Sequence, residues 1–268
     1  MVVKRIGLAA VVAVIAAVAL TSCVRLVEHG FRDQHTVGDR ITEVRVDNGS
    51  GDVTVRGRAD GTATSTDVRR FVGYPKGGAK PEGLFHRVEG TTLVLGGCGN
   101  RCYVDYDVVL PSTDVRVTGG NGSGDVRFEA VAAVEVDLGS GDVALKQVSG
   151  PVRLDNDSGD LEAADVTGDL VARTGSGNIS LSGMRGAVTL ESRSGDVDVR
   201  MAAATSVRAE TGSGNVTVHL QPASYRVDVG TGSGDQDVAV ANDPDAASEL
   251  FLRTSSGDVA VRVAQPAP

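Results

Sequence analysis

The sequence contains no tryptophan, and aromatic residues make up only 3 % of its 268 residues. Ligand clefts, sugar-binding clefts among them, rely heavily on aromatic walls, so the composition counts against such a cleft. Basic residues are also scarce, with 26 lysines and arginines against 35 aspartates and glutamates, a formal net charge of −9. An acidic surface disfavours nucleic acid, and the surface as a whole is a poor partner for anionic lipid.

Long apolar runs are missing too, except at the N-terminus. Lys4 and Arg5 precede an uncharged apolar run, Ile6–Leu20. Its 15 residues are few for a membrane span, which needs about 20, but suit the core of a signal peptide. Loss of Lys4 and Arg5 with that peptide leaves 24 basic and 35 acidic residues, a net charge near −11.

The apolar run ends in Leu20-Thr21-Ser22-Cys23, which resembles the lipobox of bacterial lipoproteins. That resemblance implies a signal peptide over 1–22, a mature chain that begins at a lipid-modified Cys23, and a tether over 23–39. The protein would then sit on the extracytoplasmic face of the cell membrane, held by its N-terminal lipid. An ordinary signal peptide, or a single anchor with an incidental cysteine, is the alternative.

Cysteine is rare, with three in the chain. Once Cys23 is acylated, Cys98 and Cys102 remain as a pair in an oxidising compartment. They bracket Gly-Asn-Arg between two alternating runs, 91–95 and 103–110, which predicts a disulfide at a hairpin tip. A zinc site would need more ligands, and the four histidines (His29, His35, His86 and His219) are scattered.

What the chain has in abundance is a repeated Ser-Gly step. The serines are Ser50, Ser123, Ser140, Ser158, Ser176, Ser194, Ser213, Ser233 and Ser256, and from Ser123 onward they are 17 to 23 residues apart. Apolar residues occur four and six positions before each serine and three and five positions after it, with Gly119 and Gln236 as the misfits. Each repeat therefore holds two short alternating strands, and the inward face changes parity at the glycine, which requires a bend there.

A repeat of about 18 residues cannot bury its own apolar stripe, whereas stacked repeats can. The sequence predicts an all-β protein: a single parallel β-solenoid of 17–20-residue turns over 40–268, with an irregular first portion that includes the disulfide hairpin at about 54–118. A flat antiparallel meander is the rival arrangement. Propeller blades need about 40 residues each and fit poorly.

Two positions after each serine lies an acidic or amide residue. The set is Asp52, Asp125, Asp142, Asp160, Asn178, Asp196, Asn215, Asp235 and Asp258. Stacking would align them in a column with a spacing of about 4.8 Å. The favoured interpretation is that each side chain accepts hydrogen bonds at its own glycine corner, as in Asx-turns. Calcium bound between neighbouring aspartates is the alternative.

The repeat serines have no histidine at a recurring spacing, so the sequence does not support nucleophilic catalysis by them. We therefore assign no catalytic, cofactor-binding or metal-binding residue.

Repeated "GSGDV" units, the opening "VRVDNGSGDV" and the central "DVVLPSTDVRVTGGNGSGDV" resemble the bacterial putative-adhesin family of unknown function. The resemblance covers about residues 40 to 263. It implies a β-solenoid on an exported or lipid-anchored surface protein, and it brings no catalytic residues with it.

The favoured function is therefore a non-enzymatic, lipid-anchored surface protein that contacts an unidentified surface protein or glycan. One alternative is a polysaccharide-acting enzyme on a β-helix, for which Arg153, Arg173, Arg193 and Arg208 are the nearest candidates. We expect these arginines to pair with neighbouring acids instead. Another alternative is the sensor or regulatory ectodomain of an envelope stress system.

Overall fold

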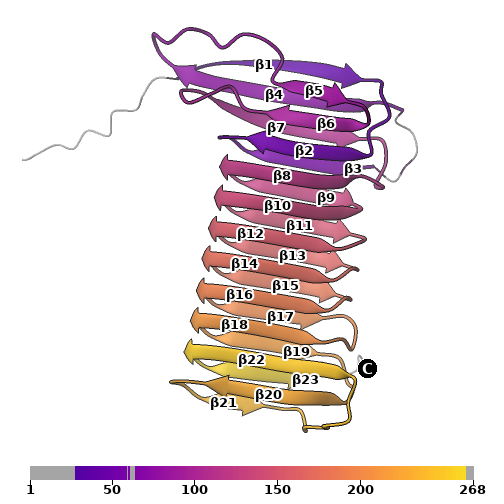
Figure 1. The fold of residues 1–268 in the computed structure, drawn as a ribbon, viewed down its shortest axis with the longest axis vertical. Helices are drawn as coiled ribbons and strands as arrows, with labels where there is room; N and C mark the ends of the chain where they lie inside the picture. Colours follow the sequence, from indigo (N-terminus) through magenta and orange to yellow (C-terminus); the bar gives the residue numbers. More distant parts are fainter. Residues whose placement is uncertain (1–27, 59, 61–63, 264–268) are drawn as a thin grey trace, which may run out of the picture.

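The computed structural model describes residues 28–58, 60 and 64–263 as a stack of coils whose strands form two sheets (Figure 1). Sheet A contains, in spatial order, β1 (Glu28–Val37), β4 (Thr66–Pro75), β7 (Tyr103–Leu110), β3 (Val53–Gly57), β9 (Val126–Val131), β11 (Val143–Val148), β13 (Leu161–Val166), β15 (Ile179–Met184), β17 (Val197–Met201), β19 (Val216–Leu220), β23 (Val259–Val263) and β21 (Gln236–Val238). Sheet B contains β20 (Tyr225–Thr231), β22 (Ser248–Ser256), β18 (Val207–Ser213), β16 (Val188–Ser194), β14 (Leu170–Ser176), β12 (Val152–Ser158), β10 (Ala133–Ser140), β8 (Arg116–Ser123), β2 (Glu43–Asn48), β6 (Thr92–Gly96) and β5 (His86–Glu89).

Neighbouring coils pair in parallel and in register, as the period of the sequence predicts. In sheet B, for example, Val136 pairs with Leu154, and Leu154 pairs with Ala172 in the next coil. The parallel solenoid is confirmed, and the antiparallel meander is wrong for the regular coils. Within the described residues, antiparallel pairing is confined to the N-terminal end, where β4 pairs with β1 and β7, and β5 pairs with β6.

The core lies between the two sheets and is filled by the apolar positions of the repeat. Leu154, Leu161, Leu181 and Val199 are at most 2 % exposed. The inward face changes parity at the Ser-Gly corner, where Gly177 has a φ of +132°. A residue with a side chain rarely adopts this conformation, which explains why glycine recurs at each corner.

The two misfits of the repeat have separate structural causes. Gly119 lies in the inward row between Val46 and Val136, with a φ of +97°. A Cβ atom there would lie 2.1 Å from the carbonyl oxygen of Val46, so a larger residue does not fit. Gln236 begins β21, the outermost strand of sheet A, where its side chain is exposed.

The coils are not stacked in chain order at either end. The coil formed by β2 and β3 lies between β6–β7 and β8–β9, although β6 and β7 come later in the sequence. At the opposite end, β22 and β23 lie between β18–β19 and β20–β21. Figure 1 shows the last coil inserted one place inside the end of the stack. The first and last coils of the regular repeat are therefore both interior coils.

The N-terminal end of the stack is closed by β1, β4, β5 and the loop between β4 and β5, which we call the N-terminal cap. Residues 28–37 form β1, which pairs along its whole length with β4. The predicted tether over 23–39 is therefore wrong for these residues. Its error has a simple cause: the inward positions of β1 include Asp33 and His35, so the strand lacks the apolar alternation of the other coils.

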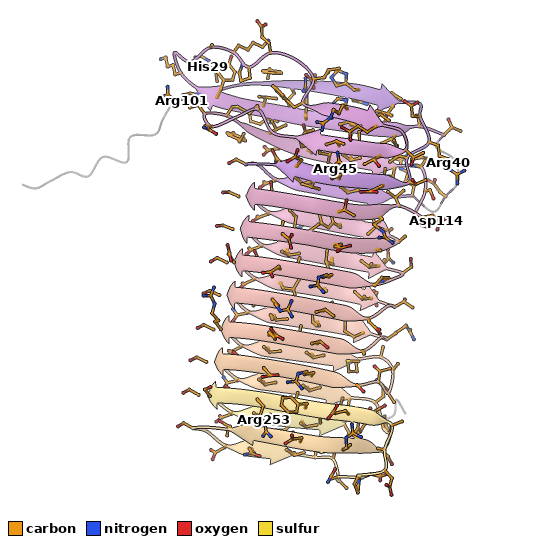
Figure 2. The ribbon with its side chains drawn as sticks, viewed as in Figure 1. His29, Arg40, Arg45, Arg101, Asp114 and Arg253 are labelled. Atoms are coloured by element: carbon orange, nitrogen blue, oxygen red, sulfur yellow. A yellow bond between two sulfur atoms is a disulfide. The ribbon has the colours of Figure 1, made fainter. Side chains whose placement is uncertain are left out.

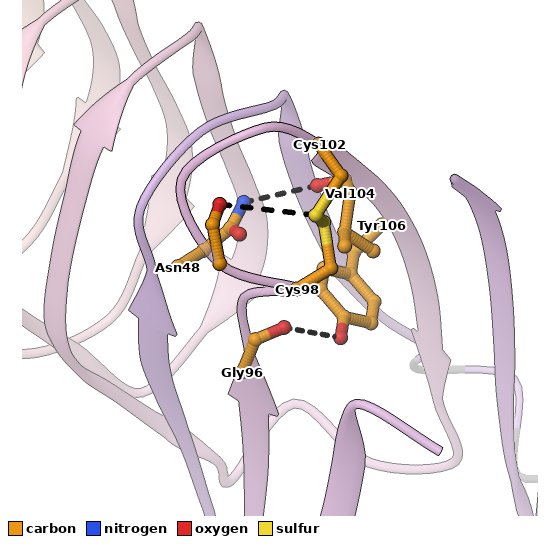
Figure 3. Close-up of a disulfide and its surroundings, with 7 residues drawn as sticks. Asn48, Gly96, Cys98, Cys102, Val104 and Tyr106 are labelled. Carbon is orange, nitrogen blue, oxygen red and sulfur yellow. Dashed lines mark hydrogen bonds between the residues drawn. A yellow bond between two sulfur atoms is a disulfide. The ribbon is translucent and has the colours of Figure 1, made fainter. Parts of the chain in front are cut away.

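Cys98 and Cys102 form the predicted disulfide, but not at a hairpin tip. The loop they close leads from β6 in sheet B to β7 in sheet A, so it is a corner of a regular coil (Figure 3). Asp47 and Val53 of the neighbouring coil pair with Gly96 and Tyr106. Nine residues, 97–105, thus take the place of the five in 48–52. The irregular portion is correspondingly smaller than the predicted 54–118, because β3, β6, β7 and β8 belong to regular coils.

No helix in the described part of the chain is long and apolar enough to span a membrane. The apolar run, the lipobox and Cys23 lie outside the described residues, so signal peptide, lipidation and location stay predictions.

Candidate functional site

The column of aspartates and asparagines is the site that the sequence singled out, and the structure aligns it along the Ser-Gly corners. Each backbone N–H in the column donates a hydrogen bond to Oδ1 of the corresponding residue in the adjacent coil. The donors are Asp52, Asp125, Asp142, Asp160, Asn178, Asp196, Asn215, Asp258 and Asp235, with N–O distances of 2.7 to 3.1 Å. The predicted Asx-turn is therefore wrong. The side-chain oxygen accepts from a backbone N–H of the adjacent coil, and not from one in its own corner.

The column begins at a residue that sequence reasoning missed. Asp105 follows the disulfide corner and accepts the N–H of Asp52 at 2.9 Å. Burial raises the pKa of the Asp105 carboxyl, the hydrogen bond from Asp52 lowers it, and the negative charge of Asp52 raises it further. No Ser-Gly step precedes Asp105, so the repeat gave no signal for it.

The same geometry explains why asparagine replaces aspartate. Asn178 and Asn215 accept through Oδ1 from Asp196 and Asp258, at 3.1 and 2.9 Å. What the corner requires is one oxygen acceptor, which a neutral amide supplies as well as a carboxylate. In the described residues no three or more His, Cys, Asp or Glu side chains are grouped so that they could hold a metal ion.

Replacement of Asp196 by asparagine should therefore change the free energy of unfolding by no more than about 1 kcal/mol, the usual size of one hydrogen bond. Asp196→Ala should cost more, because the Asn215 N–H loses its acceptor at 2.7 Å. Thermal melts of wild type and both variants, with calcium and with chelator, measure this. We expect calcium to leave every melting temperature unchanged. A rise with calcium in wild type that disappears in Asp196→Asn would instead identify a calcium site.

A second column lies beneath the corners, two positions before the serines. Its buried members are Asn48, Asn121, Asn156, Thr174, Thr211 and Thr254. Their side chains donate to carbonyls of the corner: Asn121 Nδ2, for instance, donates to Gly51 and Gly124 at 3.0 and 3.1 Å. The signal was visible in the sequence as a recurring Asn, Thr or Ser at this position, with Leu138 as the exception.

The arginines proposed for an enzyme do not converge on a site. Arg173 Nε donates to Glu191 Oε2 at 2.9 Å, and Arg208 pairs with Glu210, as expected for structural ion pairs. Arg153 and Arg193 are exposed on other strands of sheet B. A single aromatic ring, Phe251, lies beneath Arg208 at 4.0 Å from ring centroid to guanidinium carbon. These contacts are paired surface charges rather than a set of groups aimed at one reacting atom.

The N-terminal cap holds a buried polar cluster that the sequence gave no reason to expect. Arg70 is 5 % exposed and binds Asp33 with two hydrogen bonds, Nε to Oδ1 at 2.5 Å and Nη2 to Oδ2 at 2.8 Å. His35 Nε2 lies 3.3 Å from the same Oδ1, and the His35 and His86 rings are 5.0 Å apart. The Arg70 guanidinium holds the pKa of the Asp33 carboxyl below its usual range.

His86 makes this cluster sensitive to acid. It is 6 % exposed, and burial lowers the pKa of its imidazole, with the positive charges of His35 and Arg70 acting in the same direction against a smaller opposing effect of Asp33. The unfolded chain therefore binds a proton at His86 more readily than the folded chain. The free energy of unfolding should fall as pH falls through about 6.5, the ordinary histidine value, and be independent of this group above it.

Urea unfolding of wild type and His86→Gln at about pH 7.5 and about pH 5.5 tests this titration. We expect wild type to lose more stability than the variant between the two values. Equal losses in the two proteins would show that His86 is not the titrating group.

A hollow of about 550 Å³ lies on the outer face of sheet A, where β1, β4, β7 and β3 meet. Its lining mixes charges of both signs: Asp107 forms ion pairs with Arg56 at 2.5 Å and Arg69 at 3.7 Å, and Arg32 covers the ring of Phe71 at 4.6 Å. The charges are thus largely paired with one another.

Comparison with known proteins identifies the fold. The sequence profile of one family, described as Toastrack DUF4097, matches residues 38–265. No curated protein matches the chain. A "putative adhesin" from Bacteroides fragilis superposes with a TM-score of 0.52 at 15 % identity, over 88 % of this chain and 97 % of that one. A "putative adhesin" from Parabacteroides distasonis gives 0.43 at 12 % identity, over 86 % and 97 %. A "putative cell adhesion protein" from Clostridium sporogenes gives 0.27 at 12 %, over 88 % and 100 %.

Proposed function

From the premise that this chain belongs to the Toastrack DUF4097 family, we propose that it is a non-enzymatic, lipid-anchored protein of the extracytoplasmic membrane face, where its solenoid is a rigid scaffold for binding. The observation that carries the proposal is the structural use of the repeat. The recurring positions, namely the glycine, the aspartate or asparagine, and the buried Asn or Thr, form hydrogen bonds to the neighbouring coil or to the corner. They hold the scaffold together and leave its outer faces for contact.

The anchoring part of the proposal rests on Lys4, Arg5, the apolar run and the lipobox that ends at Cys23. A cysteine in this position accepts a diacylglyceryl group on its sulfur, and further acylation would keep the protein on the membrane. Export is also consistent with the Cys98–Cys102 disulfide, since such bonds persist in oxidising compartments.

The experiment that tests anchoring compares wild type with Cys23→Ala in a bacterial host that carries the lipoprotein pathway. Wild type should incorporate labelled palmitate and sediment with membranes, whereas Cys23→Ala should lose the label and leave the membrane fraction. Cys98→Ala is the control, because it removes a cysteine without touching the lipobox. Equal labelling of wild type and Cys23→Ala would reject lipidation at this residue.

The adhesive part is supported by the descriptions of proteins that share the fold, the Bacteroides fragilis protein among them. It predicts that the mature chain binds a component of the cell envelope, a protein or a glycan. Envelope extracts passed over the immobilised chain, with an unrelated acidic β-protein as the control bait, measure this. A retained component that also binds the purified chain in solution supports the scaffold; retention equal to that of the control bait contradicts it.

A further inference from the structure

A hollow of about 700 Å³ opens on the N-terminal cap, between the loop after β4 and the disulfide corner. It is lined by residues 74–81 together with Cys98, Asn100, Arg101 and Cys102. Three lining side chains are cationic, Lys76, Lys80 and Arg101, and none is acidic. We call this feature the basic hollow. It is unusual for this chain, which has only four lysines and a formal net charge of −9.

The side chains of Lys76, Lys80 and Arg101 are all exposed. None of them forms a salt bridge with an acidic side chain of the described residues, in contrast to the paired arginines of the coils. The Lys80 ammonium lies 4.5 Å from the centre of the Phe31 ring on β1, which holds that charge beside the hollow. The basic hollow thus presents positive charge to an external partner.

The basic hollow lies close to the start of β1, and therefore close to the proposed lipid anchor. The wall includes Tyr74 and Pro75, which pair with His29 and Glu28 at the start of β1. Figure 2 shows His29 and Arg101 at the same end of the cap. Cys23 precedes Glu28 by five residues, which can span at most about 18 Å. A lipid on Cys23 would therefore hold the basic hollow at the membrane surface.

The acidic remainder of the protein does not oppose contact at this end. Charges are screened over about 8 Å at physiological salt, and each coil adds about 4.8 Å to the distance from the cap. The aspartates beyond the first coils are therefore screened from a surface that touches the cap.

We propose that the basic hollow docks on anionic lipid headgroups of the membrane that carries the anchor, so that the solenoid rises away from the bilayer. This rests on the proposed lipid anchoring for its biological setting. The acyl chains on Cys23 would fix only the N-terminus in the bilayer, and contact through the basic hollow would set how the solenoid is oriented on the surface. Anionic membrane surfaces attract each nearby lysine or arginine by about 1 kcal/mol, roughly a fivefold gain in binding. Docking at the cap leaves the outer faces of the coils free for the scaffold role.

The test uses the mature chain from residue 23 with Cys23→Ser, which carries no lipid and keeps every described strand, since these lie within 28–263. Its sedimentation with phosphatidylcholine vesicles is compared with that on vesicles that also contain phosphatidylglycerol. We expect binding to the anionic vesicles alone, and loss of that binding when salt is raised. Because the protein is unlipidated, failure of acylation at Cys23 would not affect the result, and the two proposals can fail separately.

Two triple variants of this chain locate the surface. Lys76→Glu/Lys80→Glu/Arg101→Glu should lower binding to anionic vesicles about a hundredfold, because each of the three cations contributes roughly a factor of five. Arg127→Glu/Arg153→Glu/Arg185→Glu changes the net charge equally, but at exposed positions on the coils, and should bind like the parent. Equal loss in both variants, or equal parent binding to both kinds of vesicle, would overturn the proposal. Competition by inorganic phosphate beyond that of sodium chloride at equal ionic strength would also overturn it, in favour of a free-phosphate site.

Discussion

Removal of residues 248–268 is expected to unfold the C-terminal part of the solenoid, far beyond the two strands deleted. β22 pairs with both β18 and β20, and β23 pairs with both β19 and β21. Their loss leaves β20 and β21 without their in-register neighbours. It also removes four core side chains, Leu250, Leu252, Val259 and Val261, which are at most 1 % exposed. At about 1.5–3 kcal/mol for each, the deletion removes roughly 6–12 kcal/mol of hydrophobic stabilisation.

Amide hydrogen exchange measures this directly, and we expect protection to be lost from β18 through β21. Deletion of residues 177–194 is the matched control, because it removes one whole interior coil and joins Ser176 to Gly195. The flanking coils can then pair in the same register, since Ala172, Leu190 and Ala209 occupy one row. The control should keep protection on both sides of the junction. If both deletions abolished amide protection to the same extent, the interior position of β22 and β23 would not be the reason for the loss.

The substitution with the largest expected effect is Gly177→Val. Gly177 has a φ of +132°, and a Cβ atom there would lie 2.1 Å from the carbonyl oxygen and 2.5 Å from the carbonyl carbon of Gly159. Both atoms belong to the backbone of the preceding coil, so they cannot move without separating the two coils. Strain at such a conformation costs about 1–3 kcal/mol before the clash is added. We expect a loss of at least about 3 kcal/mol in the free energy of unfolding, well above the effect of Asp196→Asn.

Gly49→Val provides the matched control for this substitution. Gly49 also lies at a corner, but a Cβ atom there meets nothing within 4 Å, and its φ is outside the region that favours glycine. Denaturant unfolding of the two variants should therefore give a near-wild-type midpoint for Gly49→Val and a strongly lowered one for Gly177→Val. Similar midpoints would mean that the corner tolerates side chains and that our account of the repeated glycine is wrong.

The sequence predicts those features of the fold that depend on contacts repeated in each coil, and it does not predict features that depend on a contact made once. The inward rows could be predicted, because Leu154 and Leu161 recur at fixed offsets from a serine and period-two burial follows from strand geometry. The disulfide could be predicted because only two cysteines, Cys98 and Cys102, are left once Cys23 is assigned to the lipobox. The inverted order of the coils could not, because Leu250 and Val259 match their counterparts in every other coil and would fit several places in the stack. The only trace is in the spacing, since the intervals from Ser50 to Ser123 and from Ser233 to Ser256 are the longest.

The candidate site shows the same division. The position of the aspartate column was visible in the repeat, but its hydrogen-bond partners lie about 18 residues away and become neighbours only after stacking. The cap cluster could not be predicted, because Asp33, Arg70 and His86 come from three segments with no shared spacing. The basic hollow likewise combines Lys76 and Lys80 with Arg101 from the disulfide corner, and only the folded cap brings them together.

If the protein is anchored and binds a partner as proposed, the interior position of the coil formed by β22 and β23 affects how it resists a pulling force. A protein tethered at one end and gripped at the other is pulled along its length, and a solenoid whose last coil were outermost would peel open one strand at a time. Here a pull on β23 acts on a strand bonded to β19 on one side and to β21 on the other. Residues of β23 must leave both ladders before that part of the chain can extend. The coil of β20 and β21, which comes earlier in the sequence, thus covers the C-terminal strands on their outer side.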